Sequence, residues 1–477
     1  MPHHNYGMIL QQYQQDQVLK GFIMEKTGTI GNVDPLSGPI LKGMISYSLP
    51  VLTASILQML FSTVDTAVIG KYGTETAMSA MGVSSSVSQL LTNFLWCMGG
   101  GVTIVMGNMF GKKDTAGIHA LQQTLPLTFF VLGAIIGIPV VLLTNPILNL
   151  VKCPSSLMAD ASLYFRIRFI GAPLALLSQL PAYSLNAKGE SLVPMLFSLG
   201  SALLNTVLDL LFVGVFHWGI LGVGLATLLA EFICAAVGVV YLCRRRDELR
   251  IDLKELTLFK NMKPVFEMGI PSALEGFILN FSSVIISSFI NSFDSVAIAG
   301  NTVGTSIGSI ATIAFTSLSG ATTVFISQNN GAGNLDRVKK AWKTSLLTSF
   351  LLTESFGAVL YLMFPVLARL FTDDPAVIAA ARVCMSYMCL FYGLNAVMNI
   401  GGGCIQGMGD SRNPLILSII CSVLFRITWL YTYSRSKGTI ESVYIAYPLC
   451  WLLYAVLSII VFLYDLRKRE KELSSES

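Results

Sequence analysis

The sequence predicts an all-α integral membrane protein with twelve transmembrane helices in two six-helix lobes that are related by pseudo-symmetry. Of the 477 residues, 53% are hydrophobic and only 12% are charged, whereas a soluble domain has about 25% charged residues. The apolar residues fall into twelve runs of about 20 residues or more, the length that crosses the hydrocarbon core of a bilayer. Two short polar motifs also occur twice, in the same order and at the same separation.

The spans form two sets of six on either side of a polar segment, residues 243–263 (CRRRDELRIDLKELTLFKNMK). Residues 1–39 are polar and lack the apolar core of a signal peptide, and we expect residues 1–23 to be an expression tag or a mis-assigned start. We predict an N-terminal lobe at 40–242, the linker at 243–263, a C-terminal lobe at 264–465 and a tail at 466–477. The predicted spans are 44–70, 82–108, 119–143, 160–182, 191–215, 219–242, 264–290, 295–326, 343–365, 378–406, 412–433 and 442–464.

The two lobes repeat each other in sequence. The segment GNMFGKKD at 107–114 aligns with SQNNGAGN at 327–334, and NAKGESLVP at 186–194 aligns with QGMGDSRNP at 406–414, both with an offset of 220 residues. Each lobe has an even number of spans, so both copies have the same topology, and we expect an axis along the membrane normal to relate them. This duplication is typical of secondary transporters, in which two similar lobes move about a central site.

The distribution of positive charge predicts the orientation. Most of the 31 Lys and Arg residues fall on the side of the membrane that holds both termini, and the positive-inside rule places that side in the cytoplasm. We therefore expect a multi-pass protein of the cell membrane with cytoplasmic termini, whose partners are the lipid bilayer and a small-molecule substrate. The net charge of +4 is too small to predict nucleic-acid binding, and we expect a monomer.

The first span carries an acid within hydrocarbon. Asp65 lies near the end of the segment KGMISYSLPVLTASILQMLFSTVDTAVIG, and Pro50 lies near its start. An ionisable residue at such a depth costs about 2.5–3.5 kcal/mol on insertion scales, so it predicts a functional site. Gln58 and Ser62 share a helical face with Asp65, which predicts that this face lines a cavity. Pro50 removes a backbone hydrogen bond and predicts a bend.

The fifth span carries a second acid at a similar depth. Asp209 follows Ser201 and Asn205 on one face of this helix, and Thr227 lies at a comparable depth in the sixth span. Two carboxyl groups that meet in a medium of low dielectric hold a proton tightly or bind a cation between them. The alternative is that each acid is hydrogen-bonded separately to a hydroxyl. We predict a coupling-ion site for H⁺ or Na⁺ at Asp65, Asn205, Asp209 and Thr227.

Polar residues of the second half follow helical spacing without a matching pair of acids. They predict a neutral, hydrated cavity wall, or else side chains that bond to their own helix and to neighbouring helices. The predicted cavity residues, besides Gln58, Ser62 and Ser201, are Asn280, Asn301, Thr305, Asn395 and Asn399. Further acids inside spans are Glu231, a candidate for the first-half cluster, and Glu275 and Glu354, one of which we expect to pair with Arg426.

Several fragments, in their order along the twelve spans, resemble the multidrug and toxin extrusion (MATE) family over about residues 35 to 465. They are SLPVLTASILQMLFSTVDTAVIGKYGTETAMSAMG in the first span, LLNTVLDLLF in the fifth, GVGLAT in the sixth, and SQNNGAGNLDRVKK and IQGMGDSRNP in the second half. The resemblance implies two six-helix lobes around a central cavity, and drug efflux that is driven by the entry of protons or sodium ions.

The resemblance also implies roles for single residues. In one prokaryotic branch the first lobe carries the coupling site, and its acid, bending proline, fifth-helix Asn and Asp and sixth-helix Thr fall on Asp65, Pro50, Asn205, Asp209 and Thr227. Another branch uses an acid in the tenth helix, where this sequence has Asn395. The seventh-helix acid of that branch lies about one turn from Glu275, so the resemblance does not carry an ion site into the second lobe.

The sequence therefore predicts a secondary active antiporter that exports hydrophobic, cationic compounds by alternating access, and not an enzyme. We expect no cofactor and no metal ion other than Na⁺. One alternative is a flippase of the same superfamily for a lipid-linked precursor, although such proteins often have a cationic cavity and this one has few Lys or Arg residues. The other is a membrane-embedded enzyme, but the four His residues lie near the ends of the chain or of spans and form no HExxH motif.

Overall fold

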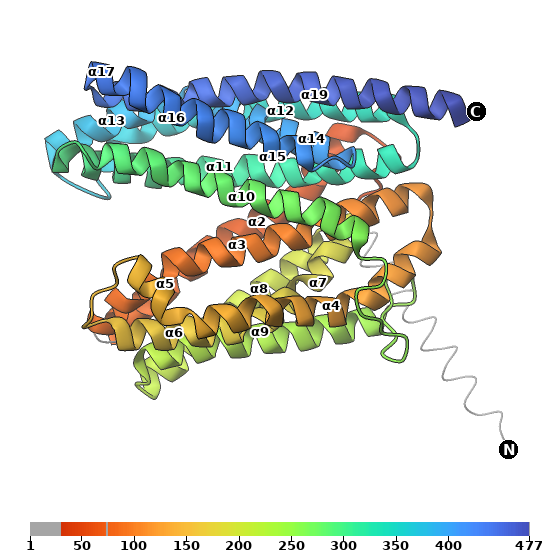
Figure 1. Ribbon diagram of the computed structural model, residues 1–477, viewed down its shortest axis with the longest axis horizontal. Coiled ribbons are helices and arrows are strands. Elements are labelled where there is room, and N and C mark those ends of the chain that lie inside the picture. Colours follow the sequence, from red (N-terminus) through yellow and green to blue (C-terminus); the bar gives the residue numbers. More distant parts are fainter. Residues whose placement is uncertain (1–29, 73–74, 477) are drawn as a thin grey trace.

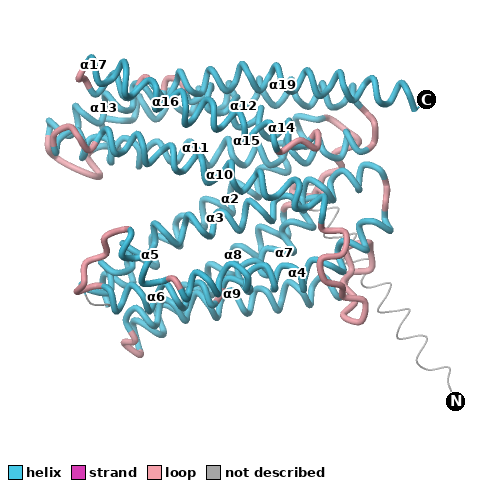
Figure 2. Tube along the Cα trace, in the orientation of Figure 1, coloured by secondary structure: helices cyan, strands magenta, loops and turns pink. Residues whose placement is uncertain are grey.

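The computed structural model describes residues 30–72 and 75–476, which are almost entirely helical (Figure 1). The predicted tag or mis-assigned start at 1–23 lies outside the described residues, as does most of the segment 1–39. Figure 2 shows helices joined by short loops, and the one β contact in the described part of the chain is an isolated bridge between Asn32 and Glu190.

The helices form two groups that lie one above the other in Figure 1, an N-terminal lobe and a C-terminal lobe. The N-terminal lobe contains α2 (Ile40–Tyr72), α3 (Glu75–Lys112), α4 (Thr115–Leu142), α5 (Thr144–Leu150), α6 (Met158–Ile170), α7 (Ala172–Lys188), α8 (Leu192–Asp209), the π-helical turn η1 (Leu210–Val215) and α9 (Gly219–Cys243).

The C-terminal lobe repeats this order after the linker. It contains α10 (Lys263–Ile290), α11 (Ser295–Gly331), α12 (Leu335–Ala368), α13 (Pro375–Cys389), α14 (Tyr392–Gly407), α15 (Arg412–Leu417), η2 (Ser418–Leu424), α16 (Phe425–Trp429), η3 (Leu430–Ser434), α17 (Arg435–Lys437), α18 (Ile440–Tyr444) and α19 (Ala446–Glu476). The run from Arg412 to Lys437 is one span that two π-helical turns interrupt.

The helices of the described residues are built to cross a membrane. Ten spans are long and apolar enough, and α13 and α14, which meet at a bend of 45°, make an eleventh. Helices α6 and α7 follow one another across Gly171, where the sequence predicts the fourth span. Large apolar side chains such as Leu142 and Leu362 are 76% and 78% exposed, which suits a surface that contacts lipid, while the helical backbone satisfies its own hydrogen bonds.

The sequence repeat appears in the backbone geometry. We call the end of the molecule that holds the linker 243–263 the linker end and the other end the far end. At the linker end, Lys113 and its repeat partner Gly333 both have positive φ angles, 57° and 71°, and Gly189 and Gly409 have φ angles of 101° and 95°. The aligned residues Asp114 and Asn334 both cap the next helix by accepting a backbone N–H three residues on.

The two lobes touch most closely where α3 crosses α11 at the linker end. A Cβ atom on Gly111 would lie 1.9 Å from the carbonyl oxygen of Gln328, and one on Gly331 would lie 2.1 Å from that of Asn108. These are reciprocal contacts, because the repeat aligns Gly111 with Gly331 and Asn108 with Gln328. Only glycine lets two helix backbones approach this closely.

Residues 31–37, the N-terminal strap, connect both lobes at this end. On the N-terminal lobe, the Val33 N–H donates to the Gly189 carbonyl at 3.0 Å, and the Ser191 N–H donates to the Gly31 carbonyl at 2.6 Å. On the C-terminal lobe, Arg337 donates to the carbonyls of Pro35 and Ser37 at 2.9 and 2.5 Å.

Ion pairs attach the start of the linker to the N-terminal lobe. Arg245 binds Glu190 through two hydrogen bonds of 2.8 and 2.9 Å and also binds Asp247. Lys188 contacts Asp247 at 2.6 Å and Glu248 at 3.0 Å. Burial favours a higher pKa for Asp247, but the hydrogen bonds from Arg245 and Lys188 outweigh burial and hold that pKa well below its usual range.

Helix α2 is shared between the lobes. Met44 and Tyr47, before Pro50, belong to the hydrophobic core of the C-terminal lobe, and the Ser48 hydroxyl donates to the carbonyl of Ser317 at 3.4 Å. The residues after Pro50 extend toward the far end, and α2 packs along α8 of the N-terminal lobe. The part of α2 before the proline contacts both lobes, because the Tyr47 hydroxyl also donates to the Asn186 carbonyl at 3.4 Å, and the part after it carries Asp65 in the N-terminal lobe.

Candidate functional site

Asp65 and Asp209 meet in the far half of the N-terminal lobe. Helices α2 and α8 pack along each other and bring the two carboxyl groups within hydrogen-bonding reach. The side chain of Asp209 is buried, with only 1% of the residue exposed, and Asp65 is half-buried. The side chain of Thr206, one turn before Asp209, lies beside Asp65.

Three of the four carboxyl oxygens of the pair lack hydrogen-bond donors among the described residues. Asp65 Oδ1 and both carboxyl oxygens of Asp209 are buried and receive no hydrogen bond from the described residues. Buried polar atoms are almost always hydrogen-bonded, and two adjacent carboxylates in low dielectric cannot both stay charged without compensation. A shared proton, or a hard cation with oxygen ligands, would both bind the unpartnered oxygens and compensate the negative charge of the pair. The residues present therefore fit either H⁺ or Na⁺.

Asn205 and Thr227 are also brought together. The Asn205 amide donates to the Thr227 hydroxyl at 3.5 Å, and that hydroxyl donates to the Val223 carbonyl of its own helix at 3.1 Å. Asn205 precedes Asp209 by one turn of α8, so all four residues of the predicted ion site lie in one region of the N-terminal lobe. Their role in coupling stays a prediction.

Two neighbours of this site were missed by sequence reasoning. Thr206 precedes Asp209 by three residues, so helical spacing alone could have placed it on the same face. Tyr164 of α6 is 8% exposed and lies close enough to interact electrostatically with Asp65 and Asp209. No sequence signal indicates Tyr164, because its proximity depends on how α6 packs in the lobe, against α3 and α9 among others.

The remaining acids inside spans have other partners. Glu231 forms an ion pair with Arg168 at 2.5 Å, which ties α9 to α6. Glu354 accepts the backbone N–H of Gly393 at 2.8 Å. The expected pairing of Arg426 with Glu275 or Glu354 is wrong: Arg426 donates to the Ser282 hydroxyl at 2.8 Å and lies over the ring of Tyr447 at 5.1 Å.

A cavity of about 440 Å³ lies between the two lobes. Residues of α2, α3 and α7 form one wall, and residues of α10, α11, α14 and α19 form the other, so relative motion of the lobes changes its shape. Its size suits one drug-sized molecule. The polar and aromatic side chains in its lining are Tyr47, Cys97, Thr103, Tyr183, Asn186, Ser272, Glu275, Ser319, Thr323, Asn399, Gln406 and Tyr454.

Asn399 is the predicted cavity residue that lines this space, and its amide donates to Asn395 Oδ1 at 2.9 Å. The Asn280 amide and the Thr305 hydroxyl donate to carbonyls of their own helices, those of Gly276 and Asn301, both at 2.8 Å. This is the alternative to a cavity wall that the sequence left open for the polar residues of the second half. The structure also places Asn301 and Ser201 at half-buried positions and Gln58 and Ser62 at exposed ones.

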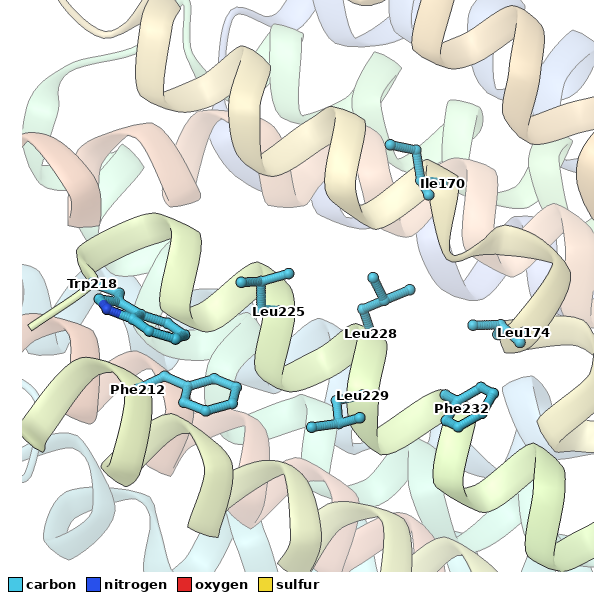
Figure 3. Close-up of a pocket in the computed structure, with 8 residues that line it drawn as sticks. All are labelled: Ile170, Leu174, Phe212, Trp218, Leu225, Leu228, Leu229 and Phe232. Atoms are coloured by element: carbon cyan, nitrogen blue, oxygen red, sulfur yellow. The ribbon is translucent and has the colours of Figure 1, made fainter. Parts of the chain in front are cut away.

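A second hollow lies on the N-terminal lobe and is lined only by apolar side chains (Figure 3). Ile170 and Leu174 flank the break between α6 and α7, and the rings of Phe212 and Trp218 lie 5.0 Å apart, tilted by 31°, near the far end. A surface of this kind matches acyl chains, and without polar groups it cannot orient a substrate. We therefore place the candidate functional site at the acid pair and the cavity between the lobes.

Comparisons with known proteins agree with this arrangement. The MatE family model matches residues 50–211 and again residues 271–432, an offset of 221 residues that also relates Pro50 to Pro271. The chain is 24% identical over 408 residues to the probable multidrug resistance protein YpnP of Bacillus subtilis, covering 85% of this chain and 91% of that protein. It is 24% identical over 438 residues to the multidrug export protein MepA of Staphylococcus aureus, covering 90% of this chain and 95% of that protein.

Solved structures share the fold. A MOP superfamily transporter from Pyrococcus furiosus superposes with a TM-score of 0.84 at 18% identity, covering 91% of this chain and 98% of that one. An outward-facing MATE family transporter of the MOP superfamily superposes with a TM-score of 0.84 at 19% identity, covering 93% of this chain and 99% of that one. These likenesses confirm the predicted twelve-helix fold, and the double match of the family model shows that this chain belongs to the MatE family, the multidrug and toxin extrusion transporters.

Proposed function

We propose that this protein is a secondary active multidrug efflux antiporter that exports hydrophobic, cationic compounds in exchange for H⁺ or Na⁺. The observation that carries the proposal is the contact between Asp65 and Asp209, two carboxyl groups from separate helices with buried oxygens that lack donors. The names of relatives that match nearly the whole chain, such as YpnP and MepA, support the drug-export part.

The division of α2 at Pro50 supplies a physical link between ion and substrate. Met44 and Tyr47 in the first part of the helix pack into the hydrophobic core of the C-terminal lobe, whereas Asp65 faces Asp209 in the N-terminal lobe. When an ion joins the two carboxyl groups, their repulsion becomes attraction, and the far part of α2 moves toward α8. A helix with an internal proline bends at low cost, so this movement is transmitted to the cavity.

The proposed cycle places the far end outside the cell and the linker end, with its clustered basic residues, in the cytoplasm. The ion enters from outside and binds the acid pair, α2 bends at Pro50, the cavity changes shape, and the substrate leaves outward. Release of the ion to the cytoplasm resets the transporter. An ion drives this cycle only if it binds the two conformations with different affinity.

The alternative of a lipid-linked precursor flippase is disfavoured by the cavity. Its described lining contains no Lys, Arg or His, and a polyphosphate headgroup needs cationic groups to bind it.

Transport in proteoliposomes tests the proposal. We expect the wild-type protein to move a cationic fluorescent dye against its gradient when a pH gradient or a sodium gradient is applied alone, and whichever gradient suffices identifies the ion. Asp65→Asn and Asp209→Asn should each abolish ion-driven dye movement, because neither amide releases a proton or carries the charge that holds Na⁺.

The matched control is Glu354→Gln, which also removes an acid inside a span but lies in the other lobe and outside the cavity lining. Size-exclusion chromatography of each variant checks that it stays folded. Full ion-driven export by either aspartate variant would contradict the assignment.

A further inference from the structure

The carboxyl group of Glu275 is the one acid in the described lining of the cavity between the lobes. Glu275 is 9% exposed. Its Oε1 accepts the Tyr454 hydroxyl at 3.1 Å and the Ser418 hydroxyl at 3.3 Å, and its Oε2 accepts the Gln406 amide at 2.9 Å. Three helical segments, α14, η2 and α19, thus converge on one carboxyl group of α10.

All three donors are neutral, so they orient the carboxyl group without cancelling its charge. An arrangement of donors around both oxygens complements the ionised form of a carboxylic acid. Arg426, a buried cation of the same lobe, is held instead by Ser282 and Tyr447. The described cavity lining contains no other charged group, so no cation of the protein neutralises this carboxyl group inside the cavity.

The opposite wall supplies groups that suit the apolar part of an organic cation. Tyr47 of α2 and Tyr183 of α7 line the same space as Glu275, and so does Tyr454 of α19 on the wall that holds Glu275. Aromatic faces attract cations as well as apolar groups, by about 0.5–2 kcal/mol each. A buried carboxyl group in a cavity that tyrosine side chains also line suits an organic monocation better than a neutral molecule of the same shape.

We infer that Glu275 is a charge-selecting subsite in the cavity, with Gln406, Ser418 and Tyr454 as its positioning residues, and that it takes the positive charge of the exported compound. This inference rests on the proposed function, because it concerns the substrate of the same transporter. The subsite is separate from the acid pair: Asp65 and Asp209 meet in the N-terminal lobe, where three of their four carboxyl oxygens lack donors, whereas the Glu275 carboxyl group lies in the C-terminal lobe and accepts from three donors.

Equilibrium binding to the purified full-length protein tests the inference. The probes are tetraphenylphosphonium, a permanent cation, and triphenylphosphine oxide, a neutral compound with similar rings. We expect the wild-type protein to bind the cation about tenfold or more tightly than the neutral compound, since removing one charge from a buried charge pair costs at least that factor. Glu275→Gln should bind both probes with similar affinity and leave the affinity for the neutral compound unchanged.

Two further variants make the result decisive. Glu275→Asp keeps the charge on a shorter side chain and should retain most of the preference for the cation. Glu354→Gln, which removes an acid that does not line the cavity, should behave as the wild type does. A preference for the cation that survives in Glu275→Gln would overturn the inference, as would an equal loss of affinity for both probes, which would show a purely structural role.

The binding experiment needs no ion gradient, so its outcome is independent of the coupling mechanism. If charge selection fails while Asp65→Asn still abolishes gradient-driven dye movement, then only the subsite is wrong. If charge selection holds while no gradient drives movement, then the antiport proposal fails and the subsite remains.

Discussion

The side-chain amide of Gln328 donates a 2.6 Å hydrogen bond to the backbone carbonyl of Ala187 and so joins the two lobes at the linker end. The next two residues of α11 also donate from buried positions, Asn329 to the Pro35 carbonyl of the strap at 3.0 Å and Asn330 to the Met408 carbonyl at 3.1 Å. These side chains lie beside the glycine crossing of α3 and α11. The bond between Gln328 and Ala187 must therefore break if the lobes are to separate on this side, whereas the bond between Asn330 and Met408 lies within the C-terminal lobe.

Removal of Arg337 should loosen the strap. Arg337→Ala deletes the hydrogen bonds to the carbonyls of Pro35 and Ser37, and the half-buried bond to Pro35 is by itself worth about 1.5 kcal/mol. We expect the backbone amides of residues 31–37 to exchange with deuterium at least about tenfold faster. The control is Lys339→Ala on the same helix, whose partner Glu470 lies outside the strap. Equal protection of the strap in both variants would contradict a role for Arg337.

A methyl group on Gly111 should prevent the close crossing of α3 and α11. Its Cβ would lie 1.9 Å from a backbone oxygen, which cannot move aside as a side chain can. We expect Gly111→Ala to lower the melting temperature in detergent, with an overpacking cost of about 1–3 kcal/mol or more. Gly100→Ala on the same helix is the matched control, because no atom lies within 4 Å of its added Cβ. The prediction fails if the two variants melt at the same temperature.

The ion pair between Arg168 and Glu231 should show strong coupling in a double-mutant cycle. Both side chains are largely buried, at 18% and 14% exposure, so Arg168→Met leaves Glu231 without its counter-charge, at a cost of about 3–5 kcal/mol. The double variant Arg168→Met/Glu231→Gln should recover most of the lost stability. Melting temperatures of the two single variants and the double variant measure the coupling, and strictly additive losses would exclude it.

The ion pairs at the start of the linker predict a pH dependence of stability. Because the folded state lowers the pKa of Asp247, its ionised form stabilises the protein above the unfolded-state pKa of about 4, and this contribution is lost as the pH falls through the folded value. The difference in melting temperature between the wild type and Asp247→Asn should be largest near neutral pH and should shrink below about pH 4. A difference that stays constant down to about pH 3 would argue against the ion pairs.

The sequence by itself determined the spans, the duplication and the four residues of the predicted ion site. These features follow from local or periodic properties: the length of an apolar run, the spacing of residues on one helical face, and motifs that recur at a fixed offset. Even the matching φ angles at Gly189 and Gly409 follow from the aligned motifs that contain them. Asp65 and Asp209 were predictable because an acid in hydrocarbon stands out wherever it lies.

Only the tertiary structure decided which side chains meet. Glu231 has Arg168 as its partner, Arg426 has Ser282, and Glu275 has donors from three other segments. The rotation of each helix about its own axis selects these partners, and that rotation is set by packing against neighbouring helices that are distant in sequence. For the same reason the closure of the linker end, where the strap, Gly111 and Gln328 come together, is a property of the assembled lobes.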